Sequence, residues 1–231
     1  MGAVRPNLVI ADGDMTGLLA SAAAARADDF VGSPELAEGS VRRSGSAVWV
    51  PPFVAAGARE AALRHAELFG LAVVESVEEP AIVAGRGGDF GLDGPRESRL
   101  LLDAVSVARG AGLGTVIWPI HAGERLDLDT VARAVDRGLL VARLAAIDGV
   151  GGAGAPIGVD VPYADFTDEQ VAELALDMDL PVSTCWWWSG GGERGAAARA
   201  RWSVALRAVG WTDAPVPAVT LRVDRAKPAT T

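Results

Sequence analysis

Cysteine and lysine are almost absent from this sequence. Cys185 is its one cysteine, and Lys227, near the C-terminus, is its one lysine. A single cysteine excludes an intramolecular disulfide and any zinc site that needs several thiolates. Because no other lysine is present, an anion site in the folded domain has to use arginine side chains or backbone N–H groups.

Positive charge and long apolar runs are also scarce. The formal net charge is −9, and binding to nucleic-acid phosphates needs a basic face, so we expect no nucleic-acid partner. The apolar run at residues 8–11 is far too short for a membrane span or a signal-peptide core. We therefore expect a cytoplasmic protein that has no membrane partner.

What the sequence does contain is an alternation of short apolar runs and longer amphipathic segments. With 231 residues, half of them hydrophobic, the chain can build one sizeable domain, which we place at residues 1–211 before a loose tail at 212–231. The alternation predicts an α/β fold in which a parallel sheet has helices on both faces. We expect strands at 7–11, 46–53, 71–75, 114–120 and 157–161, helices at 15–25, 55–69, 95–112, 128–147, 167–179 and 195–209, and loops at 28–45 and 76–94, the latter with a short strand at 81–84.

Several motifs in the second half of the chain follow one another in a specific order. Residues 161–171 read V-P-Y-A-D-F-T-D-E-Q-V, residues 180–181 read L-P, and residues 183–186 read S-T-C-W. Upstream, residues 95–98 read P-R-E-S and residues 121–124 read H-A-G-E. This order resembles 7-cyano-7-deazaguanine synthase, a family of the N-type ATP-pyrophosphatase (PP-loop) superfamily. The motifs are specific between about residues 95 and 190, and the order of elements agrees over roughly residues 7–213.

The resemblance implies a fold, an activity and a cofactor. The fold would be a Rossmann-like parallel sheet of the adenine nucleotide alpha hydrolase type with a C-terminal helical subdomain. The activity would be an ATP-dependent C–N ligation in the queuosine (7-deazapurine) pathway, with ATP and Mg²⁺ as cofactors. The family's nucleotide loop follows the first strand, where this chain has Asp12, Gly13, Asp14 and Thr16.

Three family motifs are altered in this chain, and one of them is the Y-G-Q-x-H segment after the second strand, where residues 53–59 read F-V-A-A-G-A-R. The nucleotide loop of the family reads S-G-G-x-D-S, whereas residues 10–16 here read I-A-D-G-D-M-T. Aligned on Asp14, the loop has the Asp12 carboxylate where phosphate would lie, and like charges repel. An alignment shifted by one keeps Gly13 and puts Thr16 on the Ser but loses the Asp. Residues 192–201, where three of the family's four zinc cysteines would fall, contain neither Cys nor His. The sequence therefore predicts impaired ATP chemistry and no zinc.

Outside the loop, a ligand pocket is predicted from Arg96, His121, Asp165, Trp186 and Trp187. His121 follows the fourth strand, where it either contacts a ligand or serves as a hydrogen-bonded structural residue. Arg96 lies beside the glycine-rich loop and either holds an anion or is solvated or ion-paired. Asp165 follows a strand end, and it would either help shape the substrate side, as this segment does in the family, or act as a turn residue.

Trp186, Trp187 and Trp188 form an unusual aromatic run. We expect an extended segment whose successive side chains point to opposite faces, so that at least one ring is exposed or lines a pocket. The run would then be a stacking platform for a flat heterocycle; a core plug or subunit contact is the alternative. His65, by contrast, is expected at the surface of an amphipathic helix.

Two functions remain open on these residues. One is an ATP-dependent ligase of the 7-cyano-7-deazaguanine synthase type, with Asp14 and Thr16 at its nucleotide loop. The other is a non-catalytic or rewired relative that binds a purine-like ligand or a partner subunit. The partner subunit could be a second copy of the chain, which would give a homodimer. The altered loop favours the second.

Elemental analysis of the purified protein tests the zinc prediction. We expect no stoichiometric zinc, because one cysteine without a nearby histidine cannot supply the four ligands of a structural zinc site. One tightly held zinc ion per chain would contradict this interpretation of residues 192–201.

Overall fold

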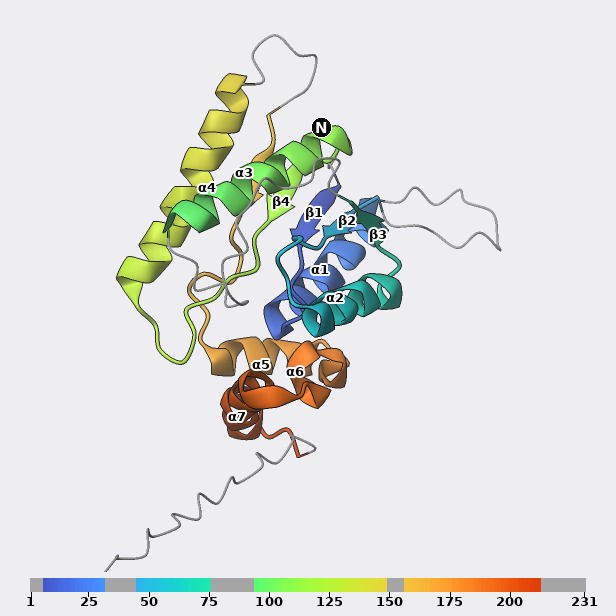
Figure 1. Ribbon diagram of the computed structural model, residues 1–231, viewed down its shortest axis with the longest axis vertical. Helices are drawn as coiled ribbons and strands as arrows, with labels where there is room; N and C mark the ends of the chain where they lie inside the picture. The colour runs from blue at the N-terminus through green and yellow to red at the C-terminus, as the bar shows by residue number, and fades with distance from the viewer. Residues whose placement is uncertain (1–5, 32–44, 76–93, 149–155, 213–231) are drawn as a thin grey trace, which may run out of the picture.

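A computed structural model of the chain describes residues 6–31, 45–75, 94–148 and 156–212 (Figure 1). Within these ranges, strands and helices alternate along the chain as expected. The elements are β1 (Asn7–Ile10), α1 (Met15–Val31), β2 (Ala47–Trp49), α2 (Ala56–Leu68), β3 (Ala72–Val74), α3 (Gly94–Gly110), β4 (Thr115–Ile117), α4 (Leu128–Asp148), β5 (Gly158–Asp160), α5 (Asp168–Asp177), the 3-10 turn η1 (Val182–Thr184), α6 (Trp186–Ser189) and α7 (Gly192–Ala208). The expected strand at 81–84, most of the loops at 28–45 and 76–94, and nearly all of the tail at 212–231 lie outside the described residues.

The five described strands form one parallel sheet in the order β3-β2-β1-β4-β5. Helices α3 and α4 cover one face of this sheet and α1 and α2 the other, while α5, α6 and α7 gather at one end (Figure 1). Along β1, Val9 belongs to the core on the α1 and α2 face, whereas Leu8 and Ile10 belong to the core on the α3 and α4 face. This alternation is what a strand covered on both faces requires. The α/β fold class predicted from the sequence is confirmed.

The boundaries of several elements follow from local chemistry. Thr167 caps α5 and forms a capping box with Gln170, as the sequence predicts. Strand β2 is shorter than expected, because Pro51 and Pro52 follow it and cannot donate to a sheet ladder. Helix α1 continues to Val31, so the prediction of a loop from residue 28 is wrong at its start; no Gly or Pro interrupts the chain between Leu18 and Val31.

The prediction that His65 lies at the surface is wrong. On α2, His65 is buried together with Ala61, Ala62 and Ala66, and its side chain has no exposed surface. Its spacing from Ala61 and Ala62 is that of a single helical face, which the sequence pattern contained. Neither ring nitrogen forms a hydrogen bond of good geometry with a described residue. Burial lowers the pKa of His65 to about 4, although the nearby Thr184 backbone partly offsets this effect.

None of the described helices is both long enough and apolar enough to cross a membrane.

A histidine that is buried in its neutral form makes folding sensitive to acid. Because the pKa of His65 is about 4 in the folded chain and 6.5 as its ordinary value, its contribution to stability is present above pH 6.5 and is lost as the pH falls toward 4. Relative to His65→Leu, which cannot take up a proton, the wild type should lose up to about 3 kcal/mol across this interval. Urea unfolding of both proteins from pH 7.5 to 4 measures this loss. A difference in unfolding free energy between the two proteins that stays constant with pH would contradict the prediction.

Candidate functional site

A cavity of about 640 Å³ lies at the carboxyl ends of β1, β2 and β4, beneath the C-terminal helices. The sheet order reverses between β1 and β4, and in open α/β sheets ligands bind in the crevice at such a reversal. Four segments supply the walls of this cavity. They are Asp12, Asp14 and Thr16 after β1; Phe53, Val54, Ala55, Gly57 and Ala58 after β2; Trp118, Pro119, Ile120, His121 and Gly123 after β4; and Trp186, Gly190, Gly191, Arg194, Gly195 and Arg201 of α6 and α7, with Glu97 and Thr130 at the rim of α3 and α4.

The loop after β1 folds tightly onto the start of α1. Asp12 Oδ1 accepts a hydrogen bond from the backbone N–H of Asp14 at 3.0 Å, and Asp14 Oδ1 accepts one from the N–H of Met15 at 2.8 Å. Gly13 has a φ of 77°, and a Cβ added to it would lie 2.3 Å from the carbonyl oxygen of Ala58. Only glycine therefore fits between the two aspartates without moving α2.

The C-terminal helices dock directly on this loop. The indole Nε1 of Trp187 donates to Asp14 Oδ1 at 2.7 Å, and the backbone N–H of Trp186 donates to the carbonyl of Gly13 at 3.0 Å. The loop thus bonds to α6 through the side chain of Asp14 and the backbone carbonyl of Gly13. These two contacts hold α6 against the β1 loop, so that Trp186 forms part of the cavity wall.

The tryptophan run adopts a different conformation from the one expected. Residues 186–189 form the single helical turn α6, so the prediction of an extended segment is wrong. The turn points the Trp187 ring fully into the core, where it stacks on Trp202 with ring centroids 6.1 Å apart. Trp186 and Trp188 are partly buried, and Trp186 lines the cavity.

Asp12 is the electrostatically unusual residue of the cavity. Its burial, together with the nearby Asp14 carboxylate, raises its pKa from 3.8 to about 7. Near neutral pH the side chain is therefore present in both its acid and its carboxylate form. Such a group can accept hydrogen bonds from a ligand or donate one, and it can transfer a proton at neutral pH.

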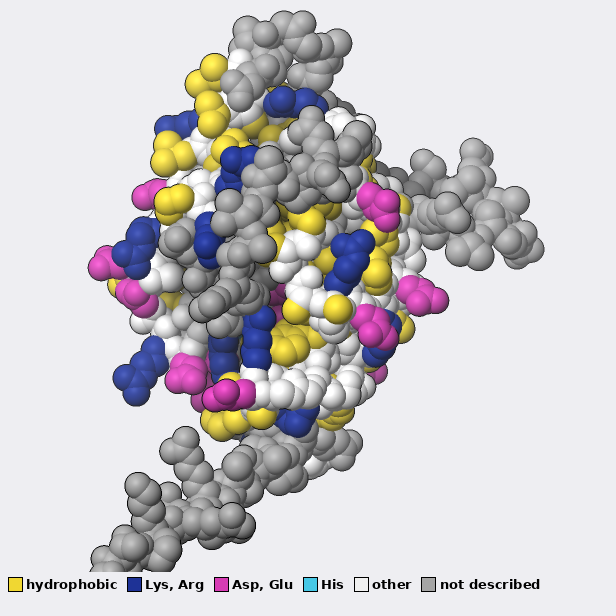
Figure 2. Space-filling model, viewed as in Figure 1, with side chains coloured by type: hydrophobic (Ala, Val, Ile, Leu, Met, Phe, Trp, Pro, Cys, Tyr) yellow, Lys and Arg dark blue, Asp and Glu magenta, His cyan; other side chains and the backbone are white. Residues whose placement is uncertain are grey.

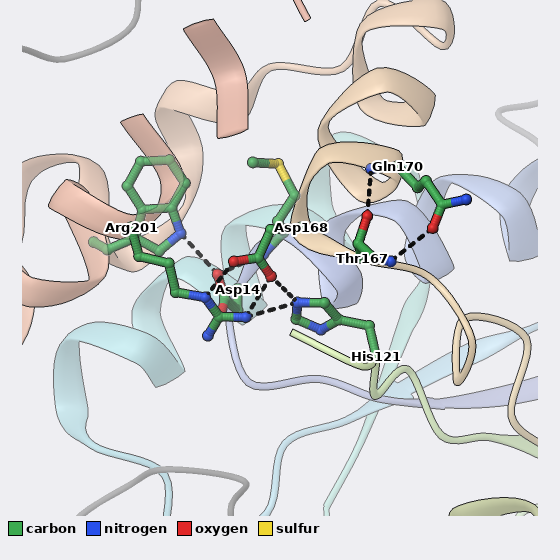
Figure 3. Close-up of polar contacts among 8 residues, drawn as sticks. Asp14, His121, Thr167, Asp168, Gln170 and Arg201 are labelled. Atoms are coloured by element: carbon green, nitrogen blue, oxygen red, sulfur yellow. Dashed lines mark hydrogen bonds and ion pairs between the residues drawn. The ribbon is translucent and has the colours of Figure 1, made fainter. Parts of the chain in front are cut away.

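A second polar cluster joins His121, Asp168 and Arg201. Arg201 donates to both oxygens of Asp168, from Nε at 2.6 Å and from Nη2 at 2.5 Å (Figure 3). His121 Nε2 lies 2.8 Å from Asp168 Oδ1 and 2.9 Å from Arg201 Nη2. One ring nitrogen holds at most one proton, and the carboxylate is the stronger acceptor, so Nε2 donates to Asp168.

This cluster keeps Asp168 ionised and gives the cavity a fixed cation. Burial would raise the pKa of Asp168, but the hydrogen bonds from Arg201 and His121 outweigh it and lower the pKa to about 2. The Arg201 side chain remains about a third exposed and belongs to the cavity wall. Its guanidinium lies 5.3 Å from the ring centre of Trp202, and that of Arg194 lies 5.4 Å from the ring centre of Trp186.

The structure brings together some of the residues predicted for the site. Asp12, Asp14, Thr16, His121 and Trp186 all line the one cavity. Gly13 shapes the loop without reaching the wall, and Trp187 lies behind Asp14 in the core. The exposed Arg96 and Asp165 lie outside the walls of this cavity.

Other residues of the site were missed by the sequence analysis. Arg201 and Asp168 are 33 positions apart, and no local pattern indicates that they pair. A signal did exist for Arg194 and Arg201, because a spacing of seven residues places both on one face of α7. Trp118 also lines the cavity, and its buried Nε1 has no hydrogen-bond partner among the described residues.

The described part of the chain contains no group of three or more His, Cys, Asp or Glu side chains placed to hold a metal ion. Asp12 and Asp14 are two carboxylates, and each already accepts a backbone N–H.

The chain matches no protein-family model, no curated protein and no solved structure at the level that indicates a relationship.

Replacing Asp12 by asparagine tests its unusual ionisation. The raised pKa means that the acid form of Asp12 favours folding, and this contribution is fully present below pH 3.8 and is lost as the pH rises through 7. Asp12→Asn stays neutral, so above pH 7 it should be more stable than the wild type by up to about 4 kcal/mol. Urea unfolding between pH 5 and 9 should show that the difference in unfolding free energy between Asp12→Asn and the wild type becomes smaller as the pH falls.

The matched control for this variant is Asp165→Asn, which changes an exposed aspartate outside the cavity wall. If the difference between wild type and Asp12→Asn is the same at every pH, Asp12 does not titrate in this interval.

Proposed function

We propose that this chain is a divergent relative of the 7-cyano-7-deazaguanine synthase type that binds a purine-like heterocycle in the cavity at the carboxyl ends of β1 and β4, without the family's ATP chemistry. The observation that carries the proposal is the partly buried Asp12 carboxyl in the cavity wall, whose pKa is raised to about 7. It stands where the family's loop would receive phosphate, and it favours a ligand that presents N–H groups.

The loop is a poor phosphate site because its own carboxylates occupy its donors. Phosphate loops at helix N-termini bind through free backbone N–H groups. Here the N–H of Asp14 donates to the Asp12 side chain and the N–H of Met15 donates to the Asp14 side chain. A triphosphate would have to displace both contacts and lie against two acidic side chains. Mg²⁺ could offset part of that repulsion, but it would not free the N–H groups.

A purine-like ring with an amide N–H and an exocyclic amine suits the same wall. A carboxylate can accept from two adjacent N–H groups, and such charge-assisted pairs are stronger than neutral ones. Trp186 contributes an aromatic wall, and a cavity of this size accommodates a small heterocycle.

An ATP-dependent ligase is the second candidate. The strand order β3-β2-β1-β4-β5 and the position of the cavity at the reversal favour it, since nucleotides bind at this place in doubly wound folds. Arg194 and Arg201 in the wall could then contact phosphates. This candidate requires the β1 loop to rearrange.

Isothermal titration separates the two candidates. We expect 7-deazaguanine to bind and ATP with Mg²⁺ to bind weakly or not at all. Asp12→Asn should weaken binding of 7-deazaguanine by roughly tenfold or more, because it removes a charge-assisted acceptor, while the exposed Asp165→Asn should bind as the wild type does. A double change of Ala11 and Asp12 to glycine should improve ATP binding.

Micromolar affinity for ATP with Mg²⁺, together with no binding of 7-deazaguanine, would contradict the proposal and favour the ligase. If the double glycine variant is folded and binds ATP no better, the loop carboxylate is not what limits ATP binding.

A further inference from the structure

Helix α4 has an apolar surface on the side that faces away from the rest of the protein. Leu139 is 51% exposed, Leu140 62% and Ile147 67%. Figure 1 shows α4 along one edge of the molecule, and Figure 2 shows hydrophobic side chains along that edge with charged ones between them. Exposed leucines scattered singly need no explanation, but several on one helix face mark a contact surface.

The fold itself uses the opposite face of the helix. Ala134, Val141 and Ala145 are buried in the core that α4 shares with α3, and Arg137 pairs with Glu97 of α3. A helix that covers one layer needs a single apolar stripe. A second apolar stripe, made of Leu139, Leu140 and Ile147, is more than half exposed.

Two opposite charges lie along the middle of this second stripe. Asp136 and Arg143 are exposed, and neither forms a hydrogen bond or ion pair with a described residue. At 100° per residue, a spacing of seven puts them on one side of the helix, with Leu139 and Leu140 between them. The arrangement Asp-Leu-Leu-Arg is self-complementary, because reversing the helix direction exchanges the two charges and the two leucines.

We propose that α4 is the contact between two copies of this chain, paired antiparallel about a two-fold axis that passes between Leu139 and Leu140. Asp136 of each copy then lies opposite Arg143 of the other, and Leu139 lies opposite Leu140. An isologous interface repeats each contact twice, which is the usual geometry of a homodimer. The complementary charges select a second copy of α4 over an unrelated apolar partner.

The proposal is independent of the ligand assigned to the cavity, although the two surfaces are close in the fold. Arg137, on the flank of α4, bonds to Glu97, and Glu97 belongs to the cavity wall. Thr130, in the first turns of α4, belongs to the same wall. The dimer contact therefore lies on the outer side of a helix whose flank touches the ligand site.

Charge reversal tests the pairing in the full-length protein. Sedimentation velocity over a range of concentrations should show a monomer–dimer equilibrium. Asp136→Arg or Arg143→Asp alone puts like charges opposite each other twice, and each should weaken dimerisation by roughly tenfold. The double variant that carries both changes should recover the wild-type dissociation constant, because it restores opposite charges in exchanged positions.

The apolar part of the contact has its own variant and control. Leu140→Gln should weaken the dimer, whereas Val204→Gln, which changes a residue of α7 that is 65% exposed, should not. Circular dichroism confirms that each variant is folded. A protein that stays monomeric at every concentration, a dimer that Leu140→Gln does not weaken, or a double reversal that fails to restore dimerisation would each overturn the proposal.

Discussion

The hydrogen bond from the Trp187 indole to Asp14 joins the two parts of the chain on which the cavity depends. Asp14 belongs to the loop at the end of β1, and Trp187 belongs to the short helix α6 near the C-terminus. Together with the hydrogen bond from the Trp186 backbone N–H to the Gly13 carbonyl, this bond fixes α6 to the β1 loop. Stacking of Trp187 on Trp202 extends this support into α7, which also supplies Arg194 and Arg201 to the wall. Loss of the indole donor would leave Asp14 Oδ1 with its contact to the Met15 N–H alone and would remove the side-chain link between the β1 loop and α6.

The same carboxylates that organise the loop also define what it can bind. Asp12 and Asp14 use the N–H groups that a phosphate would need, so the loop satisfies its own helix N-terminus. The positive charge of the site lies instead on α7, where Asp168 and His121 hold Arg201 in place. The cavity wall therefore contains the acidic side chains of the β1 loop, the aromatic ring of Trp186 and the basic side chains of Arg194 and Arg201. In the function we propose, a heterocycle would present its N–H edge to Asp12, and an anionic substituent would face the arginines.

The sequence predicts those features that depend on local pattern and fails for those that depend on tertiary contact. Alternating apolar runs predict the sheet, and Thr167 with Gln170 predicts the start of α5, because capping and strand burial are local. Trp186–Trp188 were expected to be extended, yet docking on Gly13 and Asp14 favours a helical turn that buries Trp187. His65 was placed at the surface although its spacing matches the buried face of α2. The pairing of Arg201 with Asp168 joins distant segments, and a single sequence contains no signal for it.

A crystal structure of the protein soaked with 7-deazaguanine tests the central claim most directly, namely that the Asp12 carboxylate in the cavity wall recognises the N–H edge of a purine-like ring. The account predicts that the ring lies between the β1 loop and Trp186, with its amide and amine nitrogens within hydrogen-bond distance of the Asp12 carboxylate and the Trp187–Asp14 contact intact. It would be contradicted if the ring bound elsewhere with Asp12 facing no ligand atom, or if soaking with ATP and Mg²⁺ placed phosphates at the N–H groups of Asp14 and Met15.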